Sequence, residues 1–454
     1  MKNHEDDIAA IVALAEERGL THFQPAIIDA NGRVIGKRYN VRNLKKVMTD
    51  GLPIIEAIVS ALDPAGGVIE TNPYFDPARG YADAIAVMDA SSVRDNPFAA
   101  NGQGLLLLGQ FVDGMSAVCP RALLDRELGR LGDLGYSLYG GFELECAPLA
   151  ETRESIRSKT PDSVTPMAGF DRVYSFVEES GQEDFFAAIQ TAATAMDVEL
   201  DSIHSEFIDM MEVGLRPQTG LRIADNAAIY KSLAKIVGKQ HGALVSFMAK
   251  RDNGGQGCGA HINVSLKDSA GEGTFFDSAS DENMSETFRY FLGGLTRYMP
   301  DLFLLVAPNL NSYRRYVPEM FTPLNNSWGI NNKTVAFRAI NITPGAARIE
   351  VRVAGADVNP HLGLLATVVA GRLGLEQKLE PPAGVVGDGW SIKDDPNPFP
   401  STFAEAIQKL RGSTVAREAL GDRFVDEFAD DRQWQLDQFN STVTDWELRM
   451  FADC

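Results

Sequence analysis

Residues 347–352 read Ala347-Arg348-Ile349-Glu350-Val351-Arg352 and alternate apolar with charged side chains. Because successive side chains of a β-strand point to opposite faces, this alternation predicts a strand. Arg348, Glu350 and Arg352 would share one face, while Ile349 and Val351 would face the core. Two guanidiniums around a carboxylate suit a site that binds carboxylates, phosphates and metal ions together. Taken alone, however, the stretch is more typical of a solvated strand with surface ion pairs.

Four further segments place polar side chains on predicted strands or in loops beside them. The first carries two glutamates on one strand, and the second is a strand with a polar face that follows a glycine-rich segment. The third carries two more glutamates, and the fourth carries basic residues in loops. The residues are Glu143 and Glu145; His261, Asn263 and Ser265; Glu206 and Glu212; and Arg315, Lys333 and Arg338. The period of two puts Glu143 and Glu145 on one face, and likewise His261, Asn263 and Ser265.

Each segment alone has an ordinary structural explanation, since strand glutamates are usually solvated and a histidine beside glycines is usually structural. The glycine-rich run at 254–259 is not a P-loop, because no Gly-Lys-Ser/Thr follows it. Together, five glutamates, one histidine and five cations predict a polar cleft. Oxygen-rich sites with at most one imidazole favour Mg²⁺ or Mn²⁺, and this many carboxylates suits two or three ions. This set of side chains is typical of a site for metal-assisted phosphoryl transfer that has no Walker motif.

Composition and charge restrict the class of protein. At 454 residues the chain exceeds one typical domain, and 44% hydrophobic residues are enough for a sizeable core. A net charge of −20 argues against nucleic acid or an anionic membrane as a partner, but a local cationic cluster can still hold ATP. The four cysteines lack CxxC spacing, and neither a signal peptide nor a long apolar run is visible. These features predict a soluble, cytoplasmic protein.

The order of elements predicts an α+β protein with two domains. A helix over 6–18, strands over 22–28 and 34–39 around an Asn31-Gly32 turn, a helix over 41–48, and strands over 84–88 and 105–112 form a small domain, residues 1–110. Residues 111–454 form the larger one. Its expected helices cover 120–135, 180–196, 225–241, 285–298, 360–379, 402–410 and 422–450. Residues 381–400, rich in glycine, proline and aspartate, are expected to form an exposed loop.

Six motifs, in this order along the chain, resemble those of the class I glutamine synthetase family. They are the Glu-x-Glu strand at 143–145, the glutamates at 206 and 212, the GxGxHxxxSL pattern at 257–266, the Asn-Ser-Tyr segment at 311–318, the Trp-Gly segment at 328–338, and the Arg-Ile-Glu-x-Arg strand with its downstream Asn-Pro at 348–360. The similarity extends over residues 20–450.

The resemblance implies a small amino-terminal β-grasp domain and a large catalytic domain with a curved antiparallel sheet and flanking helices. It also implies homo-oligomeric rings with active sites between subunits, most commonly a dodecamer of two hexamers. The substrates would be glutamate, an amine and ATP, with two or three Mg²⁺ or Mn²⁺ ions per site. Transfer of the γ-phosphoryl group of ATP would make an acyl phosphate, whose leaving group allows amide formation.

The resemblance also implies a role for each matching residue. One metal ion would be held by Glu145, Glu206 and Glu212, and the other by Glu143, His261 and Glu350. Arg315 would bind the α-carboxylate of glutamate and Arg352 its γ-carboxylate, beside Gly257. Lys333, Arg338 and Arg348 would neutralise the transferring phosphoryl group, with Ser265 and Asn263 near the nucleotide. The spacing before Glu212 is shortened relative to the family, so Asp209 is an alternative to Glu206.

Two departures from the family pattern concern the amine. The loop of residues 317–323 corresponds to the flap of the family, and Phe321 stands where ammonia-specific members carry a flap glutamate. Residues 51–58 are largely apolar where those members carry an aspartate. Apolar groups in place of ammonium-binding carboxylates favour an amine with an alkyl or aryl group. We therefore expect a γ-glutamyl-amine ligase. The alternatives are a glutamine synthetase that uses ammonia, with Glu56 or Glu319 as the base, and an inactive ring-forming scaffold.

Overall fold

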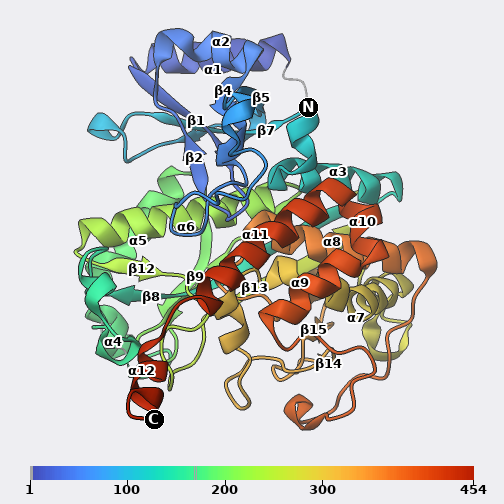
Figure 1. Ribbon diagram of the computed structural model, residues 1–454. Helices are drawn as coiled ribbons and strands as arrows, with labels where there is room; N and C mark the ends of the chain where they lie inside the picture. The colour runs from blue at the N-terminus through green and yellow to red at the C-terminus, as the bar shows by residue number, and fades with distance from the viewer. Residues whose placement is uncertain (1–3, 168, 170) are drawn as a thin grey trace.

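Two β-sheets organise the chain, which the computed structural model describes over residues 4–167, 169 and 171–454 (Figure 1). The larger sheet has nine strands, with the order β14-β15-β16-β13-β8-β10-β9 along its main path. The bounds are β14 (Trp328–Ile330), β15 (Phe337–Ile340), β16 (Arg348–Val351), β13 (Ala260–Lys267), β8 (Ser137–Leu149), β10 (Met211–Leu215) and β9 (Leu200–Ser205), with β11 (Gln218–Thr219) and β12 (Leu244–Ser246) also pairing with β8. Strands β14 and β15 pair in parallel, so the expected antiparallel sheet is mixed at one edge.

The smaller sheet belongs to the first part of the chain and has the order β2-β1-β7-β5-β4. Its strands are β2 (Val34–Gly36), β1 (His22–Ile28), β7 (Leu105–Phe111), β5 (Asp83–Met88) and β4 (Leu52–Ile55), with β3 (Tyr39–Asn40) pairing with β1 and β6 (Arg94–Asp95) with β7. Strands β1 and β7 pair in parallel. Helices α1 (Glu5–Glu17) and α2 (Leu44–Asp50) lie over this sheet, at the top of Figure 1.

The two faces of β7 bury side chains in two different cores. Leu106 and Leu108 belong to the large core of the nine-stranded sheet and its helices. Leu105 and Leu107 point the other way, into a smaller core that includes residues of α1 and α2. The strand lacks a polar face because both of its faces are covered. The smaller sheet therefore packs between its own helices and the larger part of the molecule.

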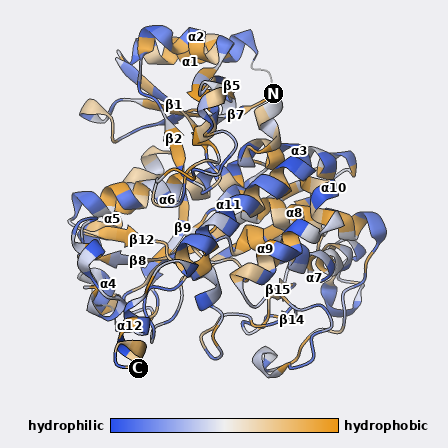
Figure 2. Ribbon diagram, viewed as in Figure 1, coloured by the Kyte–Doolittle hydropathy of each residue, from blue (hydrophilic) through white to orange (hydrophobic). Residues whose placement is uncertain are grey.

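Helices cover the larger sheet and account for most of the second half of the chain. They are α3 (Pro120–Asp133), α4 (Phe176–Ser180), α5 (Glu183–Ala195), α6 (Arg222–Gln240), α7 (Glu286–Val306), α8 (Pro360–Gln377), α9 (Phe403–Gly412), α10 (Thr414–Leu420), α11 (Asp422–Asn440) and α12 (Asp445–Phe451). α8 is largely hydrophobic, whereas α11 at the front carries mainly hydrophilic residues (Figure 2). Of the helices in the described residues, none is long and apolar enough to cross a membrane.

Helices α7 and α8 approach each other closely because glycines face each other at the crossing. A Cβ added to Gly294 would lie 2.8 Å from the Cα of Gly374, and a Cβ added to Gly374 would lie 2.6 Å from the Cα of Gly294. Real Cβ atoms do not sit at such distances, so both positions require glycine. This contact packs α7 against α8, which begins at Pro360 with Asn359 as its N-cap.

The helix expected over 422–450 is wrong, because the structure has two helices there. α11 ends at Asn440, and α12 begins after Thr444. The Thr444 hydroxyl and the Glu447 carboxylate form a reciprocal capping box, which starts a new helix. The helix expected to end at residue 298 continues through Pro300 to Val306.

A buried ion-pair network joins the smaller sheet to the helices of the larger part. The Arg121 guanidinium lies 2.7 Å from Asp89, which follows β5, and 3.0 Å from Asp225 of α6. The ring of His361 on α8 lies 2.8 Å from the Asp225 carboxylate. Burial alone would raise the pKa of Asp225, but Arg121 and His361 outweigh it and hold that pKa well below its usual range. The network therefore ties α3, α6 and α8 together with charges shielded from water.

We expect Asp225→Asn to lower the free energy of unfolding by about 3 kcal/mol or more, because it leaves a buried guanidinium short of a partner. Equilibrium denaturation in urea measures this. Asp430→Asn is the matched control, since the Asp430–Arg411 pair is mostly exposed, and its loss is expected to cost less than about 1 kcal/mol. Equal effects of the two substitutions would contradict the stabilising role of the buried network.

Candidate active site

Strand pairing places Glu350 at the centre of the predicted charged residues. It lies opposite Asn263 of β13 and opposite Arg338 of β15. The Arg338 Nη1 lies 2.8 Å from Glu350 Oε2, Arg352 Nη1 contacts Glu350 Oε1, and His261 Nδ1 lies 3.5 Å from that oxygen. Glu350 is only 1% exposed and Arg352 only 4%. The solvated-ladder explanation of residues 347–352 is therefore wrong.

The cations around Glu350 decide its ionisation. Burial by itself would raise the pKa of Glu350, because it penalises the charged form. Arg352, followed by His261 and Arg338, outweighs burial and lowers that pKa to about 2. Glu350 is thus a permanent anion held between cations, and its remaining lone pairs can accept a metal ion.

A second group of carboxylates lies on β8 and β10, next to His261. His261 lies opposite Glu143, with Nδ1 3.4 Å from Glu143 Oε2, and Glu145 lies opposite Glu212. Burial, followed by the charges of Glu145 and Glu143, raises the pKa of Glu212 to about 9. Crowded, buried carboxylates of this kind are relieved when a divalent cation binds between them. The residues therefore fit the metal ions expected from the sequence.

Three groups of described residues bring metal-ligand atoms within 4.8 Å of one another: Glu143, His261 and Glu350; Glu145, Glu212 and His261; and His204, Glu206 and Glu212. The first is the trio expected from the sequence. The second and third differ from expectation, since Glu206 groups with His204 and Glu212 and not with Glu145. The reason is that Glu206 follows the end of β9, where a short turn leads back into β10.

His204 and Tyr174 hold Glu206 in its place. His204 lies on β9 with Nδ1 3.7 Å from Glu206 and Nε2 3.6 Å from Glu212. The Tyr174 ring packs edge-on against His204 at 5.0 Å, and its hydroxyl hydrogen-bonds to Glu206. Burial raises the pKa of Glu206. Asp209, the alternative ligand, pairs with Arg251 at 3.8 Å and is outside these groups.

The polar face of β13 continues from the metal cluster toward Arg348. Asn263 donates from Nδ2 to Glu143 at 3.0 Å and accepts from Arg348 Nε at 3.0 Å. Ser265 lies two residues further along the strand, opposite Tyr139. Asn263, Ser265 and Arg348 thus extend one face from the carboxylates, as the period of two predicts.

Next to the carboxylates, the buried side chains of Arg315 and Arg352 each have a guanidinium nitrogen without a protein partner. Arg315 is 2% exposed, and its Nη1 donates to the Val353 carbonyl at 3.3 Å. The Nε atoms of Arg315 and Arg352 are both buried and unpartnered. A buried donor without a partner is costly, and an anionic ligand would supply one. A Cβ added to Gly257 would lie 2.7 Å from the Arg315 side chain, so glycine is required beside it.

Lys333 lies on the exposed loop between β14 and β15. Together with Trp328 and Asn331 it lines a cavity of about 810 Å³. The positive charge of Lys333 favours the ionised form of Glu206 and so opposes the rise in the pKa of that carboxyl group. Asn331 also accepts hydrogen bonds from Arg338, at 3.1 Å from Nε and 2.5 Å from Nη2. Lys333 and Arg338, both predicted to bind phosphate, therefore lie in the β14–β15 loop and on β15, respectively.

The residues predicted to select the amine have different environments. Phe321 is 41% exposed and has φ +52, a left-handed conformation that is unusual for an aromatic residue. Its carbonyl accepts from Arg352 Nη2 at 3.3 Å. In the segment 51–58, Leu52 and Ile54 are buried in the small core, whereas Ile55 is exposed. The base candidate Glu319 is exposed and also left-handed, with φ +64.

Sequence reasoning missed four residues that contact the site: Tyr174, His204, Asn331 and Trp390. His204 had a usable signal, because it stands two residues before Glu206 in a strand-like run. Tyr174 and Trp390 had none, because Tyr174 lies in an irregular segment and Trp390 in a short 3₁₀ turn, each far along the chain from its partners. Trp390 falls in the loop expected to be exposed, yet its indole donates to the Thr322 carbonyl at 2.9 Å.

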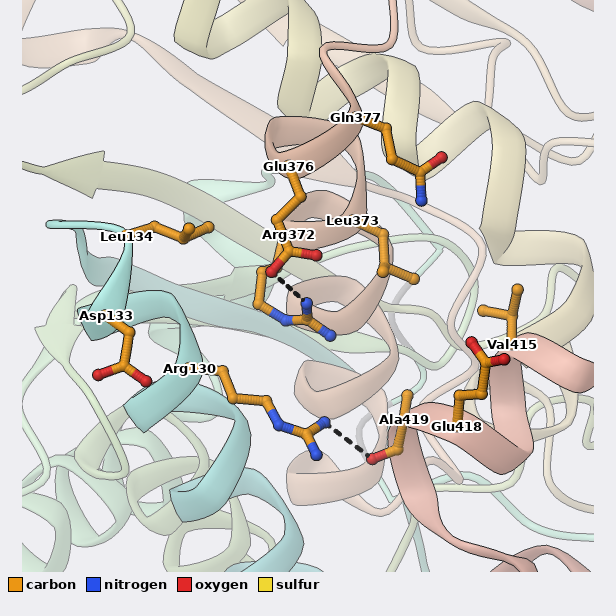
Figure 3. A pocket seen from close by; sticks show the side chains of 10 residues that line it. All are labelled: Arg130, Asp133, Leu134, Arg372, Leu373, Glu376, Gln377, Val415, Glu418 and Ala419. Atoms are coloured by element: carbon orange, nitrogen blue, oxygen red, sulfur yellow. Dashed lines mark hydrogen bonds and ion pairs between the residues drawn. The ribbon is translucent and has the colours of Figure 1, made fainter.

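A separate cavity of about 430 Å³ lies between α3, α8 and α10 (Figure 3). Its arginines are already paired. Arg372 Nη1 lies 2.7 Å from Glu376, and Arg130 Nη1 donates to the Ala419 carbonyl at 3.2 Å. Both arginines of this cavity therefore have partners within the protein. At the Arg315–Arg352 site, in contrast, the Nε atoms lack partners.

Comparison with known proteins places this geometry in a family. The pattern of the glutamine synthetase catalytic domain matches residues 117–451. The chain is 27% identical to a glutamate–isopropylamine ligase from a Pseudomonas species, covering 100% of this chain and 99% of the relative. It is 31% identical to the gamma-glutamylethanolamide synthetase of Streptomyces coelicolor, covering 93% and 91%, and 30% identical to the gamma-glutamylputrescine synthetase of Escherichia coli, covering 93% and 89%.

Solved structures show the same architecture. Apo GmaS without ligand superposes with a TM-score of 0.84 at 23% identity, covering 98% of this chain and 99% of that one. The match extends over both sheets, so it establishes the overall fold. With more than half of its length matched by the catalytic-domain pattern, the chain belongs to the glutamine synthetase family.

Proposed function

We propose that the protein is an ATP-dependent ligase that joins the γ-carboxylate of L-glutamate to an amine and forms a γ-glutamylamide. One observation carries the proposal: buried Arg315 and Arg352 have unpartnered Nε atoms beside a cluster of carboxylates suited to metal ions. A dicarboxylate substrate would satisfy both arginines, and the carboxylate cluster would hold the cations that accompany ATP. The relatives named as isopropylamine, ethanolamide and putrescine enzymes support an amine as the second substrate.

In the proposed reaction, Arg315 binds the α-carboxylate and Arg352 orients the γ-carboxylate. An oxygen of the γ-carboxylate attacks the γ-phosphorus of ATP, the bond to ADP breaks, and γ-glutamyl phosphate forms. Arg338, Arg348 and Lys333 spread the charge of the transferring group, while Asn263 and Ser265 lie near the nucleotide. Bound Mg²⁺ or Mn²⁺ would shield the phosphate charge. The residues that fit these ions are Glu143, Glu145, Glu206, Glu212, His261 and Glu350.

The second half of the reaction needs a neutral amine nitrogen. It attacks the acyl carbon of γ-glutamyl phosphate, the carbon–oxygen bond breaks, phosphate leaves, and the amine loses a proton to a base or to water. Phe321 in the flap position supports an amine with an apolar substituent over ammonia. A glutamine synthetase using ammonia remains the second candidate, because relatives with that name also match, at 30% identity over 338 residues for the Thermus thermophilus enzyme.

The finer architecture belongs to the same proposal. We propose that residues 1–110 form a β-grasp domain, that residues 111–454 form the catalytic domain, and that two or three ions bind per site. We also propose a cytoplasmic enzyme assembled as a dodecamer of two hexameric rings. Exposed apolar side chains on α4 and α12, including Phe176, Val177 and Trp446, support assembly, because isolated subunits seldom leave such groups in water.

The direct test is release of ADP in the presence of glutamate, Mg²⁺ or Mn²⁺, and one amine at a time. The panel contains ammonia, methylamine, longer alkylamines, ethanolamine, polyamines and aniline. We expect kcat/KM to be highest for a substituted amine, and mass spectrometry to show the γ-glutamylamide. Ammonia as the best substrate would establish the alternative, and absence of ADP release with every amine would contradict the proposal.

Arg315→Met is expected to raise the KM for glutamate by roughly 30-fold or more, since loss of a buried charged partner costs about 2–5 kcal/mol. The KM for ATP should change much less. Arg314→Met is the matched control, because the Arg314 side chain is exposed and lies over the Phe439 ring. An unchanged glutamate KM in a folded Arg315→Met protein would remove Arg315 from the substrate site.

A further inference from the structure

We propose that Phe207 and Trp390, together with Phe321, bind the apolar substituent of the amine, and that the preferred substrate is a primary monoamine with an alkyl or aryl group. The inference rests on the proposed function and adds to it the residues that select the second substrate. Phe207 and Trp390 come from segments of the chain that are far apart in sequence. Each of them contacts the ring of Phe321.

The three rings form one continuous cluster with Phe321 in the middle. Its ring centroid lies 5.8 Å from that of Phe207, with the rings tilted at 41°. It lies 5.8 Å from Trp390 as well, in an edge-on arrangement at 79°. Phe207 and Trp390 are each half-buried, and Phe321 is 41% exposed. The cluster therefore retains accessible aromatic surface instead of forming a closed core.

Separate contacts hold each ring. The Trp390 indole donates to the Thr322 carbonyl at 2.9 Å, which ties the 3₁₀ turn of residues 389–391 to the flap. Phe207 is fixed by the turn between β9 and β10, where its carbonyl accepts from the Met210 N–H at 2.8 Å. The unusual φ of Phe321 is maintained by these neighbours and by Arg352 at its carbonyl. A rigid aromatic surface costs little entropy when a ligand binds.

The cluster borders the reacting groups at both of its ends. Phe207 directly follows Glu206, which belongs to a candidate metal-ligand group. Phe321 is bonded through its carbonyl to Arg352, the proposed γ-carboxylate residue. An amine that reaches the γ-carboxyl carbon from this side would place its substituent against the rings. Apolar surface suits the carbon substituents of an amine.

The chemistry of the lining distinguishes among amines. Each methylene buried against the rings is expected to raise kcat/KM by roughly fourfold until the cluster is filled. A second ammonium group at the far end of a diamine would be desolvated against aromatic carbon, which is unfavourable without a paired carboxylate. Ammonia has no substituent and would gain nothing. The proposed order is therefore alkylamine or arylamine first, then diamine, with ammonia last.

The experiment measures kcat/KM of the intact enzyme for ammonia, methylamine, ethylamine, propylamine, butylamine and putrescine. The variants are Phe207→Ala, Trp390→Ala and Phe321→Glu. Phe439→Ala is the control, because Phe439 is exposed to a similar extent, 39%, but lies on α11 outside this cluster. The KM values for glutamate and ATP are measured alongside.

We expect the wild type and the Phe439→Ala control to gain activity with each added methylene. In Phe207→Ala and Trp390→Ala, the ratio of kcat/KM for butylamine to kcat/KM for methylamine should fall at least fivefold. The glutamate KM should be nearly unchanged. Phe321→Glu should shift preference toward ammonia. A wild-type preference for putrescine, or an unaltered chain-length series in both alanine variants, would overturn this inference while the ligase assignment stands. Absence of ADP release with every amine would instead overturn the proposed function itself.

Discussion

A single buried carboxylate, that of Glu350, organises the charged interior of this protein. It contacts Arg352, which directly follows its own strand, and lies 2.8 Å from Arg338 on one neighbouring strand and 3.5 Å from His261 on the other. The two guanidiniums and the neighbouring imidazole keep it ionised at a position that water barely reaches. Without that anion, two guanidiniums and an imidazole would face one another inside the sheet, at a cost of several kcal/mol.

The site is divided into regions of opposite charge that need different ligands. On β8 and β10, carboxylates are so crowded that the pKa of Glu212 rises to about 9. Toward Arg315, Arg338 and Arg352, cations predominate and two buried guanidinium nitrogens lack partners. Divalent ions would neutralise the first region, and an anionic substrate would neutralise the second. Membership in the glutamine synthetase family agrees with a site that receives metal ions, glutamate and ATP together.

Much of this arrangement could be predicted from the sequence because strands have a period of two. Alternation placed Glu143 with Glu145, and His261 with Asn263, on shared faces, and the structure confirms both through pairing across β8 and β13. The pattern could not show which strands are neighbours. The trio of Glu143, His261 and Glu350 was therefore inferred from family resemblance, and the structure brings its ligand atoms within 4.8 Å. The roles of these residues remain predictions.

What the sequence did not indicate also has physical causes. Thr444 starts a new helix through a capping box, which interrupted the expected helix over 422–450. Glu206 follows the end of β9 in a tight turn and so meets His204, a contact that depends on the path of the turn. Trp390 lies in a short 3₁₀ turn and Phe207 in a turn between strands, where no periodicity indicates which way a side chain points. Contacts of this kind depend on tertiary packing, and they shape the region where the amine is proposed to bind.

Glu350 is expected to belong to a metal site that the surrounding basic side chains stabilise. The most direct measurement is Mn²⁺ binding, followed by electron paramagnetic resonance, to the wild type, Glu350→Gln and the exposed-pair control Glu380→Gln. We predict that Glu350→Gln weakens at least one Mn²⁺ site by roughly tenfold or more, while Glu380→Gln binds as the wild type does. Identical Mn²⁺ binding by a folded Glu350→Gln protein and the wild type would contradict the account.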